Sequence, residues 1–187
     1  MYMMTEVQKI VPIPPSRLGE DIDDIVGAIA GEVFEGKLME DRSIAVLVKD
    51  AQAIGPGKIV HGDGSVYQTV KMDMLVFQLR DNEVVEGIVA EVVSFGAFVK
   101  FGPIDGLLHI SQIMDDRVDV DMENGKIIGK TTNRTLSVGD RVRARVVSIE
   151  FNEKSPEDSR IGLTMKQPGL GRLEWIEEDE RKRKGAN

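Results

Sequence analysis

The sequence contains no cysteine and only two histidines, His61 and His109, among its 187 residues. The lack of cysteine excludes disulfides, thiolate nucleophiles and cysteine-bound zinc. No uncharged run approaches the roughly 18 apolar residues that a helix needs to cross a bilayer, so we expect no membrane span. Residues 1–7 lack the basic and then apolar regions of a secretory signal, which favours a cytoplasmic location.

Aromatic residues are scarce, at 5 %, and basic residues are in the minority, since 24 Lys and Arg stand against 32 Asp and Glu. A chain with a net charge of −8 does not coat nucleic acid non-specifically, so any nucleic-acid site must be a local patch. The only sizeable basic field within a predicted fold is residues 125–166, with nine basic and five acidic side chains. Hydrophobic residues make up 41 %, which is enough for the core of one large or two small domains.

The first eighty residues have the pattern of one helix and three or four strands. Apolar side chains recur at three- and four-residue spacing from Ile22 to Val33, after acidic residues that suit the start of a helix. Strands are predicted at residues 6–11, where Pro12 should end the strand, and at residues 44–48 and 66–77. These elements predict a small α+β domain.

Glycine interrupts this first domain at several points. Gly27 and Gly31 lie inside the helix, where each costs about 1 kcal/mol relative to alanine, so we expect them to permit close packing against a sheet or a partner. The clusters Gly55-Pro56-Gly57 and Gly62-Asp63-Gly64 separate the second and third predicted strands. A phosphate loop is not supported there, because no Ser or Thr follows Lys58 and no helix comes next. We expect instead a protruding loop that another chain grips.

After residue 81 the pattern changes to short strands at regular spacing, which is typical of a small barrel. Strands are predicted at residues 84–93, 97–101, 107–110, 142–151 and 161–165. Pro168-Gly169-Leu170-Gly171 then breaks the chain, and Leu173-Glu174-Trp175-Ile176 begins a short helix. Residues 181–184 are predicted to be a solvated basic tail.

No motif for catalysis or metal binding emerges. Residues 119–123 are rich in Asp and Glu, but Asn124 and Lys130 stand where a calcium loop needs glycine and an acidic residue. An exposed acidic loop is therefore the prediction. His109 has no partner residue in a motif for nucleophilic or acid–base chemistry.

Aromatic and basic side chains alternate with core positions along the predicted barrel strands. Phe98 and Lys100 point to one face of their strand, whereas Val99 and Phe101 point to the other. Single-stranded nucleic acid is held by such aromatic faces beside cations, and each stacked base is worth about 1–3 kcal/mol. The same alternation puts three further cations on one outer face: Arg141, Arg143 and Arg145.

Three runs in this half carry a resemblance to a known domain: Gly87-Ile88-Val89, Phe95-Gly96-Ala97-Phe98-Val99 and Gly106-Leu107-Leu108-His109-Ile110-Ser111. Together with Val138-Gly139-Asp140 and residues 160–166 they resemble the S-one domain, an RNA-binding barrel with the OB fold. The resemblance implies RNA contacts by Phe95, Phe98, His109 and Arg160, with Glu150 where the family usually has Asp. The alternatives are that the two rings belong to the core of a docking barrel, and that His109 is structural.

The flanking motifs extend the resemblance to nearly the whole chain. They are Ile13-Pro14-Pro15, Leu18-Gly19-Glu20-Asp21, residues 61–67, residues 166–171 and Leu173-Glu174-Trp175-Ile176-Glu177-Glu178. Together these resemble the E-prime stalk subunits of archaeal RNA polymerase, counterparts of the seventh subunit of eukaryotic RNA polymerase II. The fold implied is α+β: a truncated RNP-like docking domain at 1–80, an all-β OB-fold barrel at 81–166 and an extension at 167–187.

The function implied is that of a non-catalytic subunit without metal or cofactor. Its N-terminal tip would dock on the polymerase core, its barrel would bind emerging single-stranded RNA, and a small helical stalk subunit, which is called F in archaea, would pack along it. The tip residues are Gly55, Gly57, Gly62, Asp63 and Gly64, and the RNA residues are Phe95, Phe98, Lys100, His109, Arg141, Arg143, Arg145 and Arg160. The alternatives are a cap or accessory subunit of an RNA-degrading complex such as the exosome, and a translation factor subunit. The order of the domains disfavours both.

Overall fold

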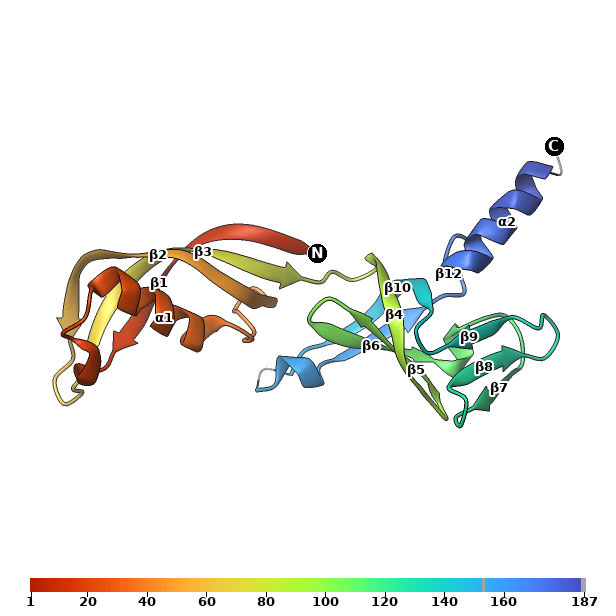
Figure 1. The fold of residues 1–187 in the computed structure, drawn as a ribbon, viewed down its shortest axis with the longest axis horizontal. Helices are drawn as coiled ribbons and strands as arrows, with labels where there is room; N and C mark the ends of the chain where they lie inside the picture. Colours follow the sequence, from red (N-terminus) through yellow and green to blue (C-terminus); the bar gives the residue numbers. More distant parts are fainter. Residues whose placement is uncertain (153, 186–187) are drawn as a thin grey trace. The chain divides into compact units, whose positions relative to one another are not determined.

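A computed structural model describes residues 1–152 and 154–185. Contacts divide the chain into two compact units, Met1–Leu79 and Arg80–Asn187. The first unit combines one α-helix with a three-stranded sheet, and the second is built around a closed β-barrel (Figure 1). The predicted fold class, an α+β domain followed by an all-β barrel, is therefore confirmed.

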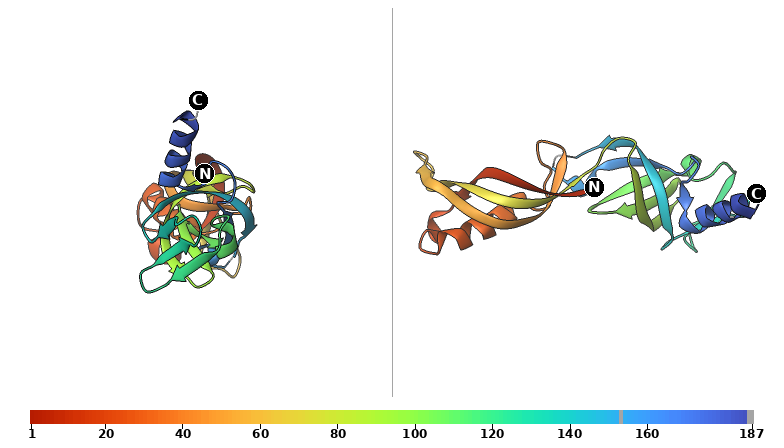
Figure 2. Two further views of the ribbon diagram at one scale, coloured as in Figure 1. Left: turned by 90° about the vertical axis from the view of Figure 1, so that its right-hand side faces the viewer. Right: turned by 90° about the horizontal axis from the view of Figure 1, so that it is seen from above.

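The N-terminal unit is an antiparallel sheet in the order β1-β3-β2 with one helix against it (Figures 1 and 2). Its elements are β1 (Tyr2–Ile13), α1 (Ile22–Phe34), β2 (Ser43–Ile59) and β3 (Val66–Gln78). The helix begins after Asp21, whose carboxylate accepts a hydrogen bond from the Asp23 N–H at 3.0 Å. Its buried face is Ile25, Val26, Ile29 and Ala30, whereas Ile22, predicted to join that face, is 49 % exposed.

Both outer strands are longer than the sequence predicts. β1 passes through Pro12, which pairs with Tyr67. Proline is tolerated there because β1 is an edge strand, where one side of the backbone has no ladder partner. β2 continues through Gly55-Pro56-Gly57 by an irregularity in its register between Ile54 and Lys58. Two predictions are therefore wrong: that Pro12 ends the first strand, and that Gly55-Pro56-Gly57 lies between the second and third strands.

The two glycines of α1 do not pack closely against the sheet. A Cβ atom at Gly27 would meet nothing within 4 Å, and one at Gly31 would meet only the Glu35 carboxyl group, at 3.7 Å. That carboxylate accepts a hydrogen bond from the Val48 N–H of β2 at 2.8 Å. The prediction that Gly27 and Gly31 pack against the sheet is wrong, because the sheet does not approach the helix at either position, and packing against a partner stays a prediction.

The barrel strands follow the order β11-β6-β5-β4-β10, and β10 also pairs with β11 to close the ring. Their bounds are β4 (Val84–Val93), β5 (Gly96–Phe101), β6 (Ile104–His109), β10 (Arg141–Glu150) and β11 (Arg160–Thr164), and β12 (Gly171–Arg172) adds to β10. The β6–β11 pair is parallel and the others are antiparallel. At Gly96, with φ +156°, a Cβ atom would collide with the Leu108 carbonyl oxygen, so the β5–β6 pairing depends on glycine there.

A second antiparallel sheet, in the order β7-β8-β9, lies between β6 and β10 in the sequence. Its strands are β7 (Val118–Asp121), β8 (Lys126–Gly129) and β9 (Thr135–Ser137). The prediction of an acidic loop at residues 119–123 is therefore wrong for β7. The alternation of Val118 and Val120 with aspartates is a strand pattern, and the sheet buries Ile127 and Leu136 completely.

Asp116, just before β7, binds the segment that connects β8 to β9. Its carboxylate accepts hydrogen bonds from the Thr132 N–H at 2.8 Å, the Thr131 N–H at 2.9 Å and the Thr132 hydroxyl at 2.9 Å. These donors favour the ionised form and hold the pKa of Asp116 well below its ordinary value.

The chain ends in α2 (Leu173–Gly185), which is longer than the predicted short helix. The helix includes Lys182, Arg183 and Lys184 in its last turn, where cations interact favourably with the helix dipole. The prediction of a basic tail beyond the helix is therefore wrong. Neither α-helix in the described part of the chain has the length and apolar character of a membrane span.

Candidate nucleic-acid interface

A hollow of about 760 Å³ lies on the outside of the barrel, where β4, β5, β6, β10 and β11 contribute side chains. Three of the residues predicted to contact RNA line it together: Phe95, Phe98 and Arg160. Glu150, the position at which the sequence departs from the family pattern, lines it as well.

The strand register explains how distant segments form the floor of the hollow. Phe98 of β5 pairs with Glu91 of β4 on one side and with Leu107 of β6 on the other. Leu107 pairs with Gly162 of β11, and Gly162 with Ser148 of β10. A Cβ atom at Gly162 would collide with the Ser148 hydroxyl. One row of paired residues therefore crosses all five barrel strands. At Gly162 the row has no side chain, which leaves room for the Ser148 hydroxyl.

The two phenylalanines form an edge-to-face pair, with ring centroids 6.4 Å apart and planes at 85°. Phe95 is 47 % exposed and Phe98 is half-buried, whereas Val99 is completely buried and Phe101 nearly so. The predicted alternation along β5 is confirmed. The alternative that both rings belong to the barrel core is wrong for Phe95, and a ring accessible on one face is a platform for a base.

The predicted cations divide into two groups. Arg160 lines the hollow, and Lys100 lies on the same face of β5 as Phe98, two residues along. The other three follow one outer face of β10, as predicted, because Val142, Ala144 and Val146 are completely buried between them. These three do not line the hollow: Arg141, Arg143 and Arg145.

Glu86 of β4 neutralises part of the β10 arginine face. Arg143 donates to its carboxylate through Nε at 2.9 Å and Nη2 at 2.8 Å, and the Arg141 guanidinium lies 3.8 Å away. The Nε of Arg145 is buried without a partner in the described part of the chain. Lys100 pairs in register with Ile88, and Ile88 with Arg141, so an exposed row leads from β5 to this face.

His109 is not among the residues that line the hollow. Its Nδ1 atom accepts a hydrogen bond from the Ser111 N–H at 3.2 Å and lies 2.8 Å from the Ser111 hydroxyl. The imidazole thereby caps the short 3-10 helix Ile110–Gln112. This cap gives His109 a structural role, and because its ring is exposed, the RNA contact stays a prediction.

The hollow also contains acidic residues that sequence analysis did not single out: Glu91, Asp105 and Asp158. Their cross-strand positions depend on the register, and Glu91 reaches its place opposite Phe98 through an irregularity in β4 after Val89. Among the described residues, no group of three or more His, Cys, Asp or Glu side chains could hold a metal ion.

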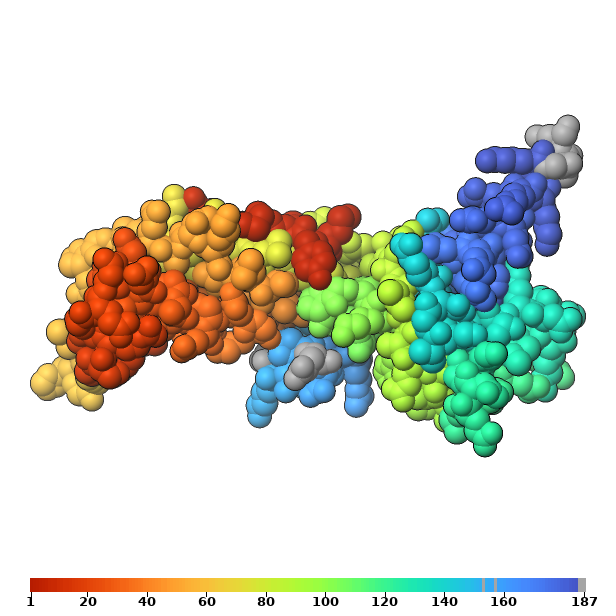
Figure 3. Space-filling model, viewed as in Figure 1, coloured from red at the N-terminus to blue at the C-terminus, as the bar shows by residue number. Residues whose placement is uncertain are grey.

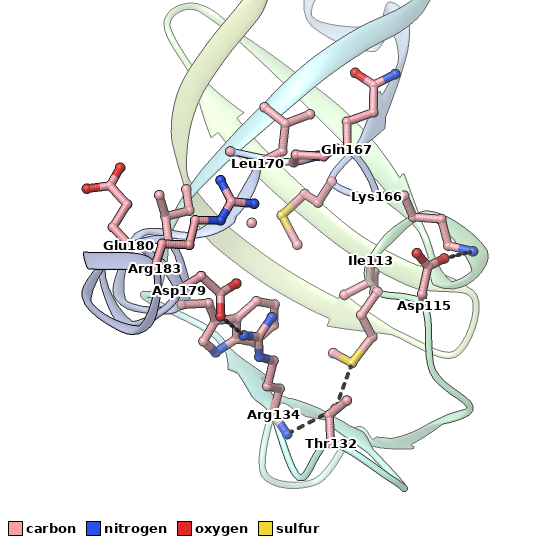
Figure 4. Close-up of a pocket in the computed structure, with 17 residues that line it drawn as sticks. Ile113, Asp115, Thr132, Arg134, Lys166, Gln167, Leu170, Asp179, Glu180 and Arg183 are labelled. Carbon is pink, nitrogen blue, oxygen red and sulfur yellow. Dashed lines mark hydrogen bonds and ion pairs between the residues drawn. The ribbon is translucent and has the colours of Figure 1, made fainter. Parts of the chain in front are cut away.

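A second cavity, of about 360 Å³, lies beneath α2 (Figure 4). Arg134 anchors the helix there: its Nη2 donates to Asp179 at 2.6 Å, and its guanidinium lies 5.5 Å from the centre of the Trp175 ring. Across the cavity Lys166 forms an ion pair with Asp115 at 2.9 Å. Because these charges are paired within the chain, the arrangement holds the helix in place.

The predicted docking residues lie at the end of the β2–β3 hairpin. Gly55 and Gly57 belong to β2 itself, and Gly62, Asp63 and Gly64 form the turn. The Asp63 carboxylate accepts hydrogen bonds from the Tyr67 hydroxyl and from the Ser65 N–H, and these bonds, the first above all, lower the pKa of Asp63. The turn projects beyond the rest of the N-terminal unit in the space-filling view (Figure 3, gold).

Comparison with known families assigns both units. Residues 8–64 match the SHS2 domain found in the N terminus of Rpb7p/Rpc25p/MJ0397, and residues 78–160 match the S1 RNA binding domain. The protein thus joins an SHS2 domain to an S1 domain, which confirms the resemblance seen in the second half of the sequence.

Relatives that match nearly the whole chain narrow the class further. The DNA-directed RNA polymerase subunit Rpo7 of Sulfolobus acidocaldarius is 40 % identical over 96 % of this chain and 97 % of its own length. The Rpo7 subunit of Saccharolobus solfataricus is 38 % identical over 94 % of this chain and 97 % of its own length. The chain belongs to the Rpo7 family of archaeal RNA polymerase subunits.

Other proteins resemble only part of the chain. Ribonuclease R of Buchnera aphidicola is 35 % identical over 49 % of this chain but only 13 % of its own length. The structure of Mycoplasma genitalium RNase R matches 44 % of this chain, with a TM-score of 0.38 and 26 % identity, and carries no conclusion about function. The full-length matches favour the Rpo7 family over the alternative of a subunit of an RNA-degrading complex.

Proposed function

We propose that the chain is a non-catalytic stalk subunit of a cytoplasmic DNA-directed RNA polymerase, docked through its N-terminal domain (1–80) and presenting its barrel (81–166) to single-stranded RNA. The observation that carries the RNA-binding half is the convergence of Phe95, Phe98 and Arg160 on one hollow of an S1 domain. The rings offer stacking surface for bases, and Arg160 a charge for phosphate.

The RNA path extends from the hollow along the barrel. Lys100 continues the face of Phe98, and Ile88 connects it in register to Arg141. Arg143 and Arg145 lie on the same face of β10 and offer further positive charge to the phosphates of the RNA. His109 contributes through its exposed ring, the Nδ1 atom being engaged with Ser111.

Docking on the polymerase core is assigned to the hairpin tip. What supports this is a turn that projects from the N-terminal unit and presents backbone rather than bulky side chains at Gly62 and Gly64 (Figure 3). Gly62 has φ +89° and open space around its Cα atom, so a side chain there would both strain the turn and enlarge the tip.

The test is co-purification with core polymerase. The double variant Gly62→Val with Gly64→Val should lose association with the core while its barrel still binds RNA. The matched control is Gly139→Val with Gly19→Val, since Gly139 also has a positive φ, +90°, and both positions are open. Retention of the core by the tip variant would show that the tip is not the anchor.

A small helical stalk protein is the second protein partner in this proposal. The sheet face away from α1 exposes apolar side chains that one chain leaves uncovered, among them Met4, Ile10 and Leu47. A stable heterodimer would bury about 2,000 Å² or more. Co-expression followed by size-exclusion chromatography tests this partner, and a monomer that is fully folded and indifferent to it would contradict the assignment.

A further inference from the structure

The hollow around Phe98 is acidic, although it is proposed to bind a polyanion. Among the described residues that line it, one cation, Arg160, stands with four carboxyl groups: Glu91, Asp105, Glu150 and Asp158. Within residues 1–152 and 154–185, none of the four side chains has a hydrogen bond or ion pair. Away from Arg160, a phosphate placed among these carboxyl groups would be repelled, whereas a neutral base would not.

Two of these carboxylates flank the Phe98 ring. Glu91 is the direct cross-strand partner of Phe98 on β4. Asp105 pairs directly with Lys100 on β5, and because it is two residues from Leu107, the partner of Phe98, it is also the diagonal neighbour of Phe98. The Cβ atoms of direct partners lie about 5 Å apart and those of diagonal partners about 7–8 Å, which is within reach of long side chains. A base stacked on Phe98 would thus have a carboxylate near its edge.

The phosphates have a better place next to the hollow. Lys100 is exposed on the same face as Phe98, and the row through Ile88 leads to Arg141. With the sugar–phosphate backbone on that row, the bases point toward the carboxylates. The hydrogen-bonding edges of the bases would therefore face carboxylate oxygens, which accept hydrogen bonds.

We propose that Glu91 and Asp105 make the Phe98 subsite selective for bases with an exocyclic amino group over uracil. This inference rests on the proposed function, that the hollow binds single-stranded RNA. An ionised carboxylate only accepts hydrogen bonds, and the amino group of cytosine, adenine or guanine donates them. Uracil has one N–H between two carbonyl oxygens. The carbonyl oxygens are repelled by a carboxylate, because both groups are acceptors.

The test compares short oligocytidylate with oligouridylate of equal length, by fluorescence anisotropy on the full chain. The two pyrimidines stack over similar areas, so the comparison reports the hydrogen-bonding edge: cytosine has an amino group at C4 and an acceptor at N3, whereas uracil has a carbonyl oxygen at C4 and an N–H at N3. Oligocytidylate should bind about tenfold more tightly. In Glu91→Gln, whose amide can also donate to a carbonyl oxygen, the ratio should fall toward one, and Asp105→Asn provides a second, independent variant.

The matched control is Glu123→Gln, which removes the same charge from an exposed side chain in the turn after β7 and should keep the preference. Equal affinity of the unaltered chain for both oligomers would overturn the inference and leave RNA binding intact. A preference that persists in both Glu91→Gln and Asp105→Asn would overturn it too. If neither oligomer binds, the proposed function itself fails.

Discussion

Replacing Phe98 by alanine removes the central ring of the hollow. Stacking of one base on an aromatic side chain is worth about 1–3 kcal/mol, so the affinity for single-stranded RNA should fall by about 5- to 150-fold. Because Phe98 also supports Phe95 through their edge-to-face contact at 6.4 Å, the loss should exceed that of Phe95→Ala. The barrel should stay folded, since the core side of β5 is formed by Val99 and Phe101.

The measurement is a titration of labelled single-stranded RNA followed by fluorescence anisotropy, with urea unfolding of the same preparation to establish folding. Tyr2→Ala is the matched control: its ring is half exposed and makes an edge contact with Phe77 at 5.1 Å in the other unit. It should bind RNA like the parent chain. Folded Phe98→Ala and Arg160→Ala variants that both bind like the parent would refute the assignment of this face.

Three further predictions concern the scaffold. Asp116→Asn should lower the melting temperature at neutral pH. The difference in melting temperature between the parent and the variant should shrink as the pH falls below 3.8, the ordinary Asp pKa, because a lowered pKa stabilises the fold only while the carboxylate is ionised. Gly96→Ala should lose about 1–3 kcal/mol of unfolding free energy in urea, by collision within the β5–β6 pair. Arg134→Ala should shift the fluorescence of Trp175, the only tryptophan, to longer wavelength as α2 loosens, and Arg181→Ala, whose ion pair is exposed, should not.

Local patterns predicted the elements that have one solvent face. The alternation of Phe98 and Lys100 with Val99 and Phe101 needed no tertiary information, because the side-chain period of a strand is fixed by its backbone. The same rule missed β7, where residues 118–121 alternate but the many aspartates suggested a loop. Pro12 misled because proline ends a central strand but not an edge strand, and edge position is a property of the sheet.

The sequence predicted the aromatic residues and the arginine of the candidate site but not its carboxylates. Phe95, Phe98 and Arg160 were found through motif resemblance, but the carboxylates beside them depend on register. The irregularity after Val89 sets which β4 residue faces Phe98, and no local signal announces it. His109 could not be resolved between two roles because its cap on Ser111 is a matter of side-chain geometry.

The parallel pair of β6 with β11 joins strands that lie far apart in the sequence, so the barrel can close only late in synthesis. The N-terminal unit is complete once β3 ends at Gln78, whereas the barrel cannot close until Arg160–Thr164 has left the ribosome. Until then the meander β4-β5-β6 keeps an unpaired edge at β6, the kind of edge that recruits other chains. The aromatic half of the hollow is therefore synthesised before its arginine, and we expect a chain that stops short of β11 to aggregate through the open edge of β6.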